Sequence, residues 1–166
     1  MSKISVELSD LDIIDIKEKI GLEPLIFVGT KDMIKLVKDY KNKFFIINLD
    51  NSFENGGSGG SHWVALSTFK DYPVYFDSYA VFPPLDVEKF IKKRYKKFYY
   101  WNSQIQGIKA SYCGWICIMF LNILYKDFIL KNKTFFEFVN YFESLFDIDE
   151  QTKNYYVVNK YFSKII

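Results

Sequence analysis

The chain has 166 residues, of which 49% are apolar and 20% aromatic, a composition too hydrophobic for a disordered protein. Its 22 basic and 20 acidic residues give a formal net charge of only +2, which excludes a polycation built to coat nucleic acid. The length predicts one domain over residues 1–166. Two cysteines exclude a disulfide scaffold and favour a reducing compartment, and no segment resembles a secretion signal or a membrane-spanning helix. We therefore expect a soluble, intracellular protein.

The first part of the chain predicts helices followed by a strand. An apolar periodicity that begins after Ser9 and stops at Gly21 predicts an amphipathic helix with a serine N-cap and a glycine C-cap. A second helix is expected over residues 31–40, and the apolar run at 44–49 predicts a strand. A glycine-rich stretch at 51–61 predicts a loop between two strands.

The middle of the chain predicts an antiparallel hairpin formed by strands at 62–69 and 74–77. The hairpin places His62 at the start of its first strand and Asp77 at the end of its second strand. These are neighbouring positions in an antiparallel pair. Two prolines then predict the start of a helix that runs over residues 85–95.

The rest of the chain predicts a strand at 98–101 and three helices. The first of these helices, over residues 113–125, is apolar all round, a pattern typical of a buried central helix. Amphipathic helices are expected at 134–146 and 151–162. The fold class is therefore α+β, with a small mixed sheet packed on a central helix that begins at Cys113.

Two residues suggest nucleophilic catalysis. His62 is the only histidine, so any mechanism that needs an imidazole base must use it. Cys113 begins the apolar helix, where the helix dipole and unpaired amides favour a thiolate, and Gly114 after it allows close approach to a substrate carbonyl. Cys117, one turn further, is expected in the core. Each residue alone also has an ordinary structural explanation, so the hypothesis rests on the set.

A cysteine nucleophile and its base need further groups. Asp77 can orient the imidazole of His62, and Gln106 lies in the polar segment before Cys113, where its amide can donate to an oxyanion. Asp77 is also an ordinary turn residue, and a glutamine in a loop is usually just solvated. Two thiols and one imidazole are too few for a closed zinc site, so we expect no metal and no other cofactor.

A cluster of basic residues stands apart from these groups. Such a cluster is typical either of a solvated helix face or of a surface that contacts phosphates or an anionic protein. The cluster consists of Lys89, Lys92, Lys93, Arg94, Lys96 and Lys97.

Four short motifs together resemble the adenovirus maturation proteases and, more distantly, the proteases that remove ubiquitin-like proteins. They are Gly60-Ser61-His62-Trp63, Tyr75-Phe76-Asp77-Ser78, Gln106-Gly107 and Cys113-Gly114-Trp115-Ile116-Cys117. The glutamine precedes the cysteine by seven positions, as in the adenovirus type, whereas this offset is usually one shorter in the deconjugating enzymes. Asp77 followed by Ser78 is closer to the deconjugating enzymes, since the adenovirus acid is Glu. The resemblance covers residues 8–125.

The resemblance implies a cysteine endopeptidase that cuts beside small residues, commonly glycine, in a narrow cleft. The implied roles are nucleophile for Cys113, base for His62, orienting acid for Asp77 and oxyanion donor for Gln106. The residues expected to contact the substrate are Gly60, Trp63 and Gly114.

The implied substrates are capsid or core precursor proteins that are cleaved during virion maturation, in the virion or the host cell cytoplasm, by a monomer. The alternatives are removal of ubiquitin or a relative from host proteins, and a protein-binding module that keeps the fold without proteolysis. The adenovirus enzyme has a cysteine upstream of its glutamine that links to an activating peptide. No cysteine precedes Cys113, so a peptide linked in that form is excluded. The resemblance to that enzyme also implies a contact with DNA through the basic cluster.

Overall fold

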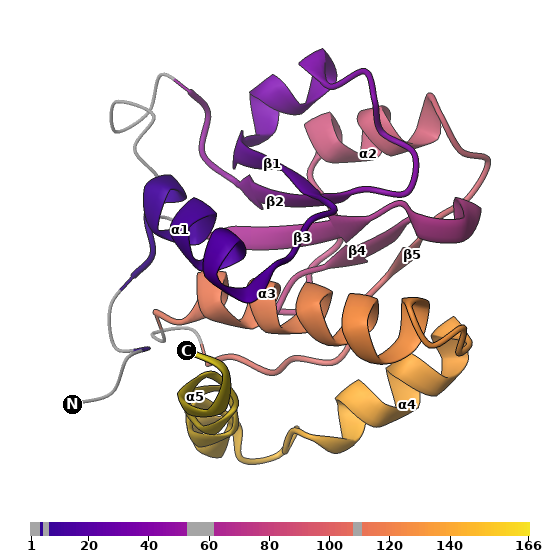
Figure 1. Cartoon of the computed structure of the whole chain (residues 1–166). Coiled ribbons are helices and arrows are strands. Elements are labelled where there is room, and N and C mark those ends of the chain that lie inside the picture. Colours follow the sequence, from indigo (N-terminus) through magenta and orange to yellow (C-terminus); the bar gives the residue numbers. More distant parts are fainter. Residues whose placement is uncertain (1–3, 5–6, 53–61, 108–110) are drawn as a thin grey trace.

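A computed structural model describes residues 4, 7–52, 62–107 and 111–166, and a mixed sheet of five strands lies at its centre (Figure 1). In spatial order the strands are β1 (Leu25–Thr30), β2 (Phe44–Asn48), β3 (Trp63–Ser67), β4 (Val74–Phe76) and β5 (Tyr99–Tyr100). The three central strands pair antiparallel, and each edge strand pairs parallel to its neighbour. The expected α+β fold with a small mixed sheet is confirmed.

Helices cover both faces of the sheet. They are α1 (Asp10–Ile20), α2 (Leu85–Lys92), α3 (Cys113–Ile123), α4 (Phe135–Ser144) and α5 (Asn154–Ile165). Residues of α2 pack against one face, and residues of α1, α3, α4 and α5 pack in the core on the other face (Figure 1). Alternate residues of β2 divide between the two cores, Phe44 and Ile46 on the α3 side and Phe45 and Ile47 on the α2 side.

The first helix has the two predicted caps. The backbone N–H of Asp12 donates to the Ser9 hydroxyl at 3.2 Å, and the Asp12 carboxylate accepts from the backbone N–H of Ser9 at 2.9 Å. This reciprocal pair satisfies amides that the first helical turn leaves without partners. Gly21 ends the helix with φ at 68°, a left-handed conformation that glycine adopts without steric cost. Both boundaries of this helix were therefore predictable from local chemistry.

The segment that follows differs from the prediction. Leu25–Thr30 forms strand β1, which the sequence analysis did not identify, and the helix expected at 31–40 is a short 3-10 helix over Lys31–Leu36. Within this short helix only Ile34 is fully buried, so there is no apolar stripe to hold a longer helix against the sheet. Its first turn is tied down instead by Asp32, whose carboxylate accepts from the Ser52 hydroxyl at 2.6 Å.

Helix α3 is the central helix that the sequence predicts, and all eleven of its residues are buried. Because α3 lies between the sheet and helices α4 and α5, it has no face left for solvent (Figure 1). Phe120 stacks on Phe76 of β4 with ring centroids 4.2 Å apart and meets Phe138 and Phe142 edge-on. The helix continues into a π-helical segment, Leu124–Ile129. The packing of α3 therefore fixes the position of its first residue, Cys113.

Among the residues that the structure describes, we find no helix with the length and apolar character needed to cross a membrane.

The packing of α3 gives a prediction about stability. We expect Phe120→Ala to lower the free energy of unfolding by about 3–5 kcal/mol, because it removes a fully buried ring and leaves a cavity. The matched control is Phe136→Ala, since that side chain is 72% exposed and its loss should change the free energy by less than about 0.5 kcal/mol. Urea denaturation followed by circular dichroism measures both. Equal effects of the two substitutions would contradict the central role of α3.

Candidate active site

The register of strands β3 and β4 brings His62 and Asp77 together. Ala65 lies opposite Phe76 in the antiparallel pair, so the residue before β3 and the residue after β4 are at the same end of the sheet. The Nε2 atom of His62 lies 2.7 Å from Oδ1 of Asp77. The carboxylate side chain is 2% exposed and the imidazole 12% exposed, so this is a nearly buried hydrogen bond.

The turn after β4 orients the Asp77 carboxylate. Its Oδ1 atom also accepts the backbone N–H of Tyr79 at 2.8 Å, and the Asp77 carbonyl accepts the N–H of Ala80 at 2.8 Å. The ring of Tyr79 stacks on the imidazole of His62, with centroids 4.4 Å apart and planes 19° apart. The carboxylate and the imidazole are therefore both held in one orientation, and Tyr79 is a contributor that the sequence analysis did not identify.

The first residue of α3 reaches the same end of the sheet. The sulfur of Cys113 accepts a hydrogen bond from the backbone N–H of Trp63, the residue after His62, at 3.4 Å. The thiol of Cys117 donates to the carbonyl of Trp63 at 3.3 Å, so one peptide segment of β3 contacts both sulfurs. Both cysteines are free. Burial raises the pKa of Cys117 well above its usual value, which keeps that thiol neutral.

The environment of His62 favours the imidazolium. Burial by itself lowers the pKa of His62, but the hydrogen bond with Asp77, together with the interaction with Cys113, outweighs burial and raises this pKa to about 9. Because Nε2 contacts Asp77, the other ring nitrogen, Nδ1, remains to interact with the thiol. Nδ1 is buried and has no hydrogen-bond partner by distance and angle among the described residues, although the Cys113 side chain contributes to the raised pKa of the ring.

Gln106 is fixed next to the Asp77 turn by Ser78. The Ser78 hydroxyl donates to Oε1 of Gln106 at 2.6 Å, and the backbone N–H of Gln106 donates to the Ser78 carbonyl at 3.1 Å. Both residues have no exposed surface. With Oε1 held by this hydroxyl, the NH2 group of the amide is directed away from Ser78. The sequence analysis included Ser78 only as part of a motif and gave it no role.

The structure describes two of the three residues expected to contact substrate, and both are buried. Trp63 is 3% exposed, and its indole N–H donates to the carbonyl of Leu8 at 2.9 Å. Gly114 is buried, and an added Cβ would lie 3.3 Å from side-chain atoms of Leu8 and of Trp63. The Trp63 side chain and Gly114 therefore pack closely against Leu8, and their contact with substrate stays a prediction. Gly60 lies outside the described residues.

Residues of the basic cluster take part in local structure. The guanidinium of Arg94 lies 3.9 Å from the ring centroid of Phe90 and donates to the Phe90 carbonyl at 2.9 Å. Lys92 forms an ion pair with Glu88 at 2.9 Å. Contact between this cluster and DNA stays a prediction. In the part of the chain that the structure describes, no three His, Cys, Asp or Glu side chains group closely enough to hold a metal ion.

Comparisons with known proteins support the fold. No family model matches the chain, and no curated protein sequence matches it. Among solved structures, the crystal structure of the selenomethionine ASFV pS273R protease is similar, with a TM-score of 0.51 and 16% sequence identity. The match covers 93% of this chain and 68% of that protease. The chain therefore has the fold of a known protease, although its sequence differs at most positions.

The raised pKa of His62 gives a prediction about pH. A raised pKa means that the charged imidazole stabilises the fold fully below a pH of about 6.5, and that this contribution is lost as the pH rises through about 9. A shift of this size corresponds to a contribution on the order of 3 kcal/mol. Asp77→Asn should therefore be less stable than the unsubstituted protein at about pH 6, and the difference should shrink by about pH 10. Urea denaturation at both pH values measures it.

The control for this experiment is Asp149→Asn, since Asp149 is exposed and far along the chain from the site. Its effect on stability should be small at both pH values. A destabilisation by Asp77→Asn that does not change with pH would show that the carboxylate does not control the charge of His62.

Proposed function

We propose that this protein is a cysteine endopeptidase in which Cys113 is the nucleophile and His62 its base. The observation that carries the proposal is the environment of the only imidazole in the chain. One ring nitrogen lies 2.7 Å from a buried carboxylate, and the thiol at the start of α3 lies 3.4 Å from the backbone nitrogen of Trp63, the next residue in the chain. Such an arrangement supplies a nucleophile, a base and an orienting acid from three separate elements.

The Cys113 sulfur lies beside donor groups of the main chain. The backbone N–H of Trp63 donates to it, and the N-terminal end of α3 adds the positive end of the helix dipole. The imidazole of His62 has a raised pKa, so it holds a proton readily near neutral pH. In the proposed mechanism the proton moves from the thiol to His62, and an ion pair of thiolate and imidazolium precedes attack.

The thiolate attacks the carbonyl carbon of the scissile peptide bond and forms a tetrahedral oxyanion. The side-chain amide of Gln106 and the backbone N–H of Cys113 donate to this oxyanion. His62 then gives its proton to the leaving amine, the C–N bond breaks, and a thioester to Cys113 remains. A water molecule, deprotonated by His62, hydrolyses the thioester and restores the thiol. Asp77 keeps the imidazole oriented and stabilises its charge throughout.

The substrate assignment rests on resemblance. The motifs resemble the adenovirus maturation proteases, and the structural neighbour is a protease of ASFV. We infer capsid or core precursor proteins as substrates, cut beside glycine, with the enzyme acting as a monomer in the virion and the host cell cytoplasm. Asp77 followed by Ser78 supports a second candidate, removal of ubiquitin or a relative from conjugates, because this pair is typical of the deconjugating enzymes.

The nucleophile assignment gives a prediction about turnover. Cys113→Ala should abolish cleavage, while Gln106→Ala should lower turnover on the order of 100-fold or more, as loss of an oxyanion donor does. The matched control is Cys117→Ala, one turn further along α3, which should keep its activity. The assay incubates each variant with precursor proteins encoded by the same genome and sequences the new termini.

Three further results test the proposal against the other candidate functions. Cleavage of Gly-Gly-linked ubiquitin conjugates, and not of the precursors, would favour the deconjugating function. An active-site thiol probe that leaves Cys113 unlabelled at neutral pH would indicate a binding module without proteolysis. Cleavage by Cys113→Ala at the rate of the unsubstituted protein would remove the basis of the whole proposal.

The contact between Ser78 and Gln106 gives a separate prediction. Ser78→Ala should lower turnover roughly tenfold, because the loss of this hydrogen bond weakens the contacts that orient the Gln106 amide toward the oxyanion. The same substitution should have little further effect in a Gln106→Ala protein. The control is Ser67→Ala, which changes another buried serine and should leave the turnover of substrate unchanged. Equal losses with and without Gln106 would show that Ser78 acts through some other group.

A further inference from the structure

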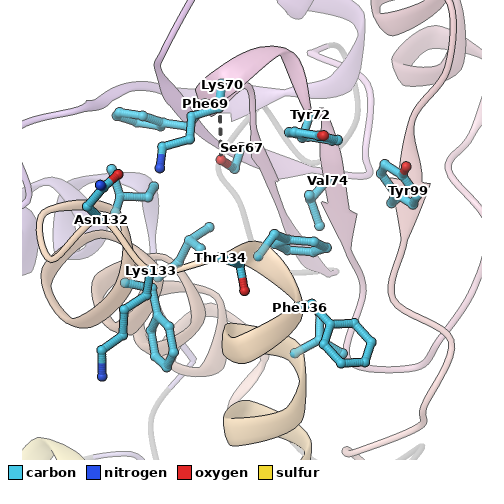
Figure 2. A pocket seen from close by; sticks show the side chains of 15 residues that line it. Ser67, Phe69, Lys70, Tyr72, Val74, Tyr99, Asn132, Lys133, Thr134 and Phe136 are labelled. Carbon is cyan, nitrogen blue, oxygen red and sulfur yellow. Dashed lines mark hydrogen bonds between the residues drawn. The ribbon is translucent and has the colours of Figure 1, made fainter.

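A pocket lies at the opposite end of the sheet from the candidate active site. It opens between the turn that joins β3 to β4 and the segment that joins α3 to α4, and its volume is about 640 Å³ (Figure 2). Ser67 lines the pocket and is the last residue of β3, whereas His62 immediately precedes β3. Five residues of strand separate them by roughly 17 Å. The pocket is therefore distinct from the groups that surround Cys113.

The interior of the pocket is apolar, and its lining includes two exposed tyrosines. Val74, Leu124 and Phe128 line it and are only 3%, 4% and 6% exposed. Tyr72 and Tyr99 also line it but are 49% and 41% exposed. A volume of several hundred Å³ with mostly apolar walls and a few polar groups is typical of sites for small organic molecules. Exposed aromatic surface beside such a cavity indicates a place where a ligand is bound.

The basic side chains of the pocket lie on one side. Figure 2 shows Lys70, Asn132 and Lys133 on the side away from Tyr72 and Tyr99. No acidic residue lines the pocket, and neither lysine has an ion-pair partner among the described residues. The ammonium group of Lys133 lies 5.6 Å from the ring centroid of Phe128, which keeps this charge beside the apolar wall. The pocket thus combines a positive side with an apolar interior.

We propose that this pocket binds a single-chain anionic amphiphile, a long-chain carboxylate. Its acyl chain packs on Val74, Leu124 and Phe128, and its carboxylate lies at the side of the pocket that carries the positive charge of Lys70 and Lys133. A neutral apolar ligand would leave both lysines without a counter-charge. A small polar anion would leave the apolar wall uncovered. Only a molecule with both parts matches both sides of the pocket. The inference is independent of the protease activity proposed for Cys113.

The test is calorimetric titration of the full chain with dodecanoate below the concentration at which it forms micelles. We expect saturable binding of one molecule per chain. Octanoate and decanoate should bind more weakly, with affinity rising by roughly fourfold for each added methylene group. Dodecanol, which has the same chain length and no charge, should bind at least about tenfold more weakly than dodecanoate because it gains no contact with the lysines.

Variants locate the site. Lys70→Gln combined with Lys133→Gln should weaken dodecanoate binding about tenfold or more and leave dodecanol binding unchanged. The matched control is Lys96→Gln combined with Lys97→Gln, which removes the same charge from exposed positions outside the pocket and should change neither affinity. The proposal is overturned by the absence of saturable binding, by equal binding of the alcohol, or by equal effects of the two double variants.

Discussion

The hydrogen bond between His62 and Asp77 is the interaction on which the candidate site depends. Asp77 is buried, and a buried carboxylate without a partner is strongly unfavourable, so its position requires the imidazole and the amide of Tyr79. The bond in turn requires the register that puts Ala65 opposite Phe76. A shift of one residue in this pairing would turn every side chain of β3 to the other face. The hydrogen bond between His62 and Asp77 and the pairing register of β3 and β4 therefore depend on each other.

Helix α3 supplies the second half of the geometry. Its sides are wholly buried, so its packing leaves little freedom to slide along β3. The main chain of Trp63 links the two elements, because its N–H contacts the sulfur of Cys113 and its carbonyl contacts the thiol of Cys117. Cys113 is thereby placed by a packed helix and a central strand, and such elements hold side chains more precisely than loops do.

Much of the fold was predictable from the sequence because it depends on residues that are neighbours in the chain. Caps around Ser9 and Gly21 and the apolar pattern of α3 each report on a few neighbouring residues. Strand β1 was not predictable in this way, since it lies at an edge of the sheet and its burial varies along its length without a period of two. The bond from Ser78 to Gln106 spans 28 positions and exists only after the tertiary fold has formed. Trp63 illustrates the same limit, because its motif does not reveal which way its ring points.

The protein contains one histidine, and that histidine is the ring beside Asp77 and Cys113. Imidazole resonances in a nuclear magnetic resonance spectrum of the intact molecule therefore come from a single known place. Their chemical shifts report the charge of this ring without assignment by mutagenesis. The ring is thus an intrinsic probe of its hydrogen bond with Asp77.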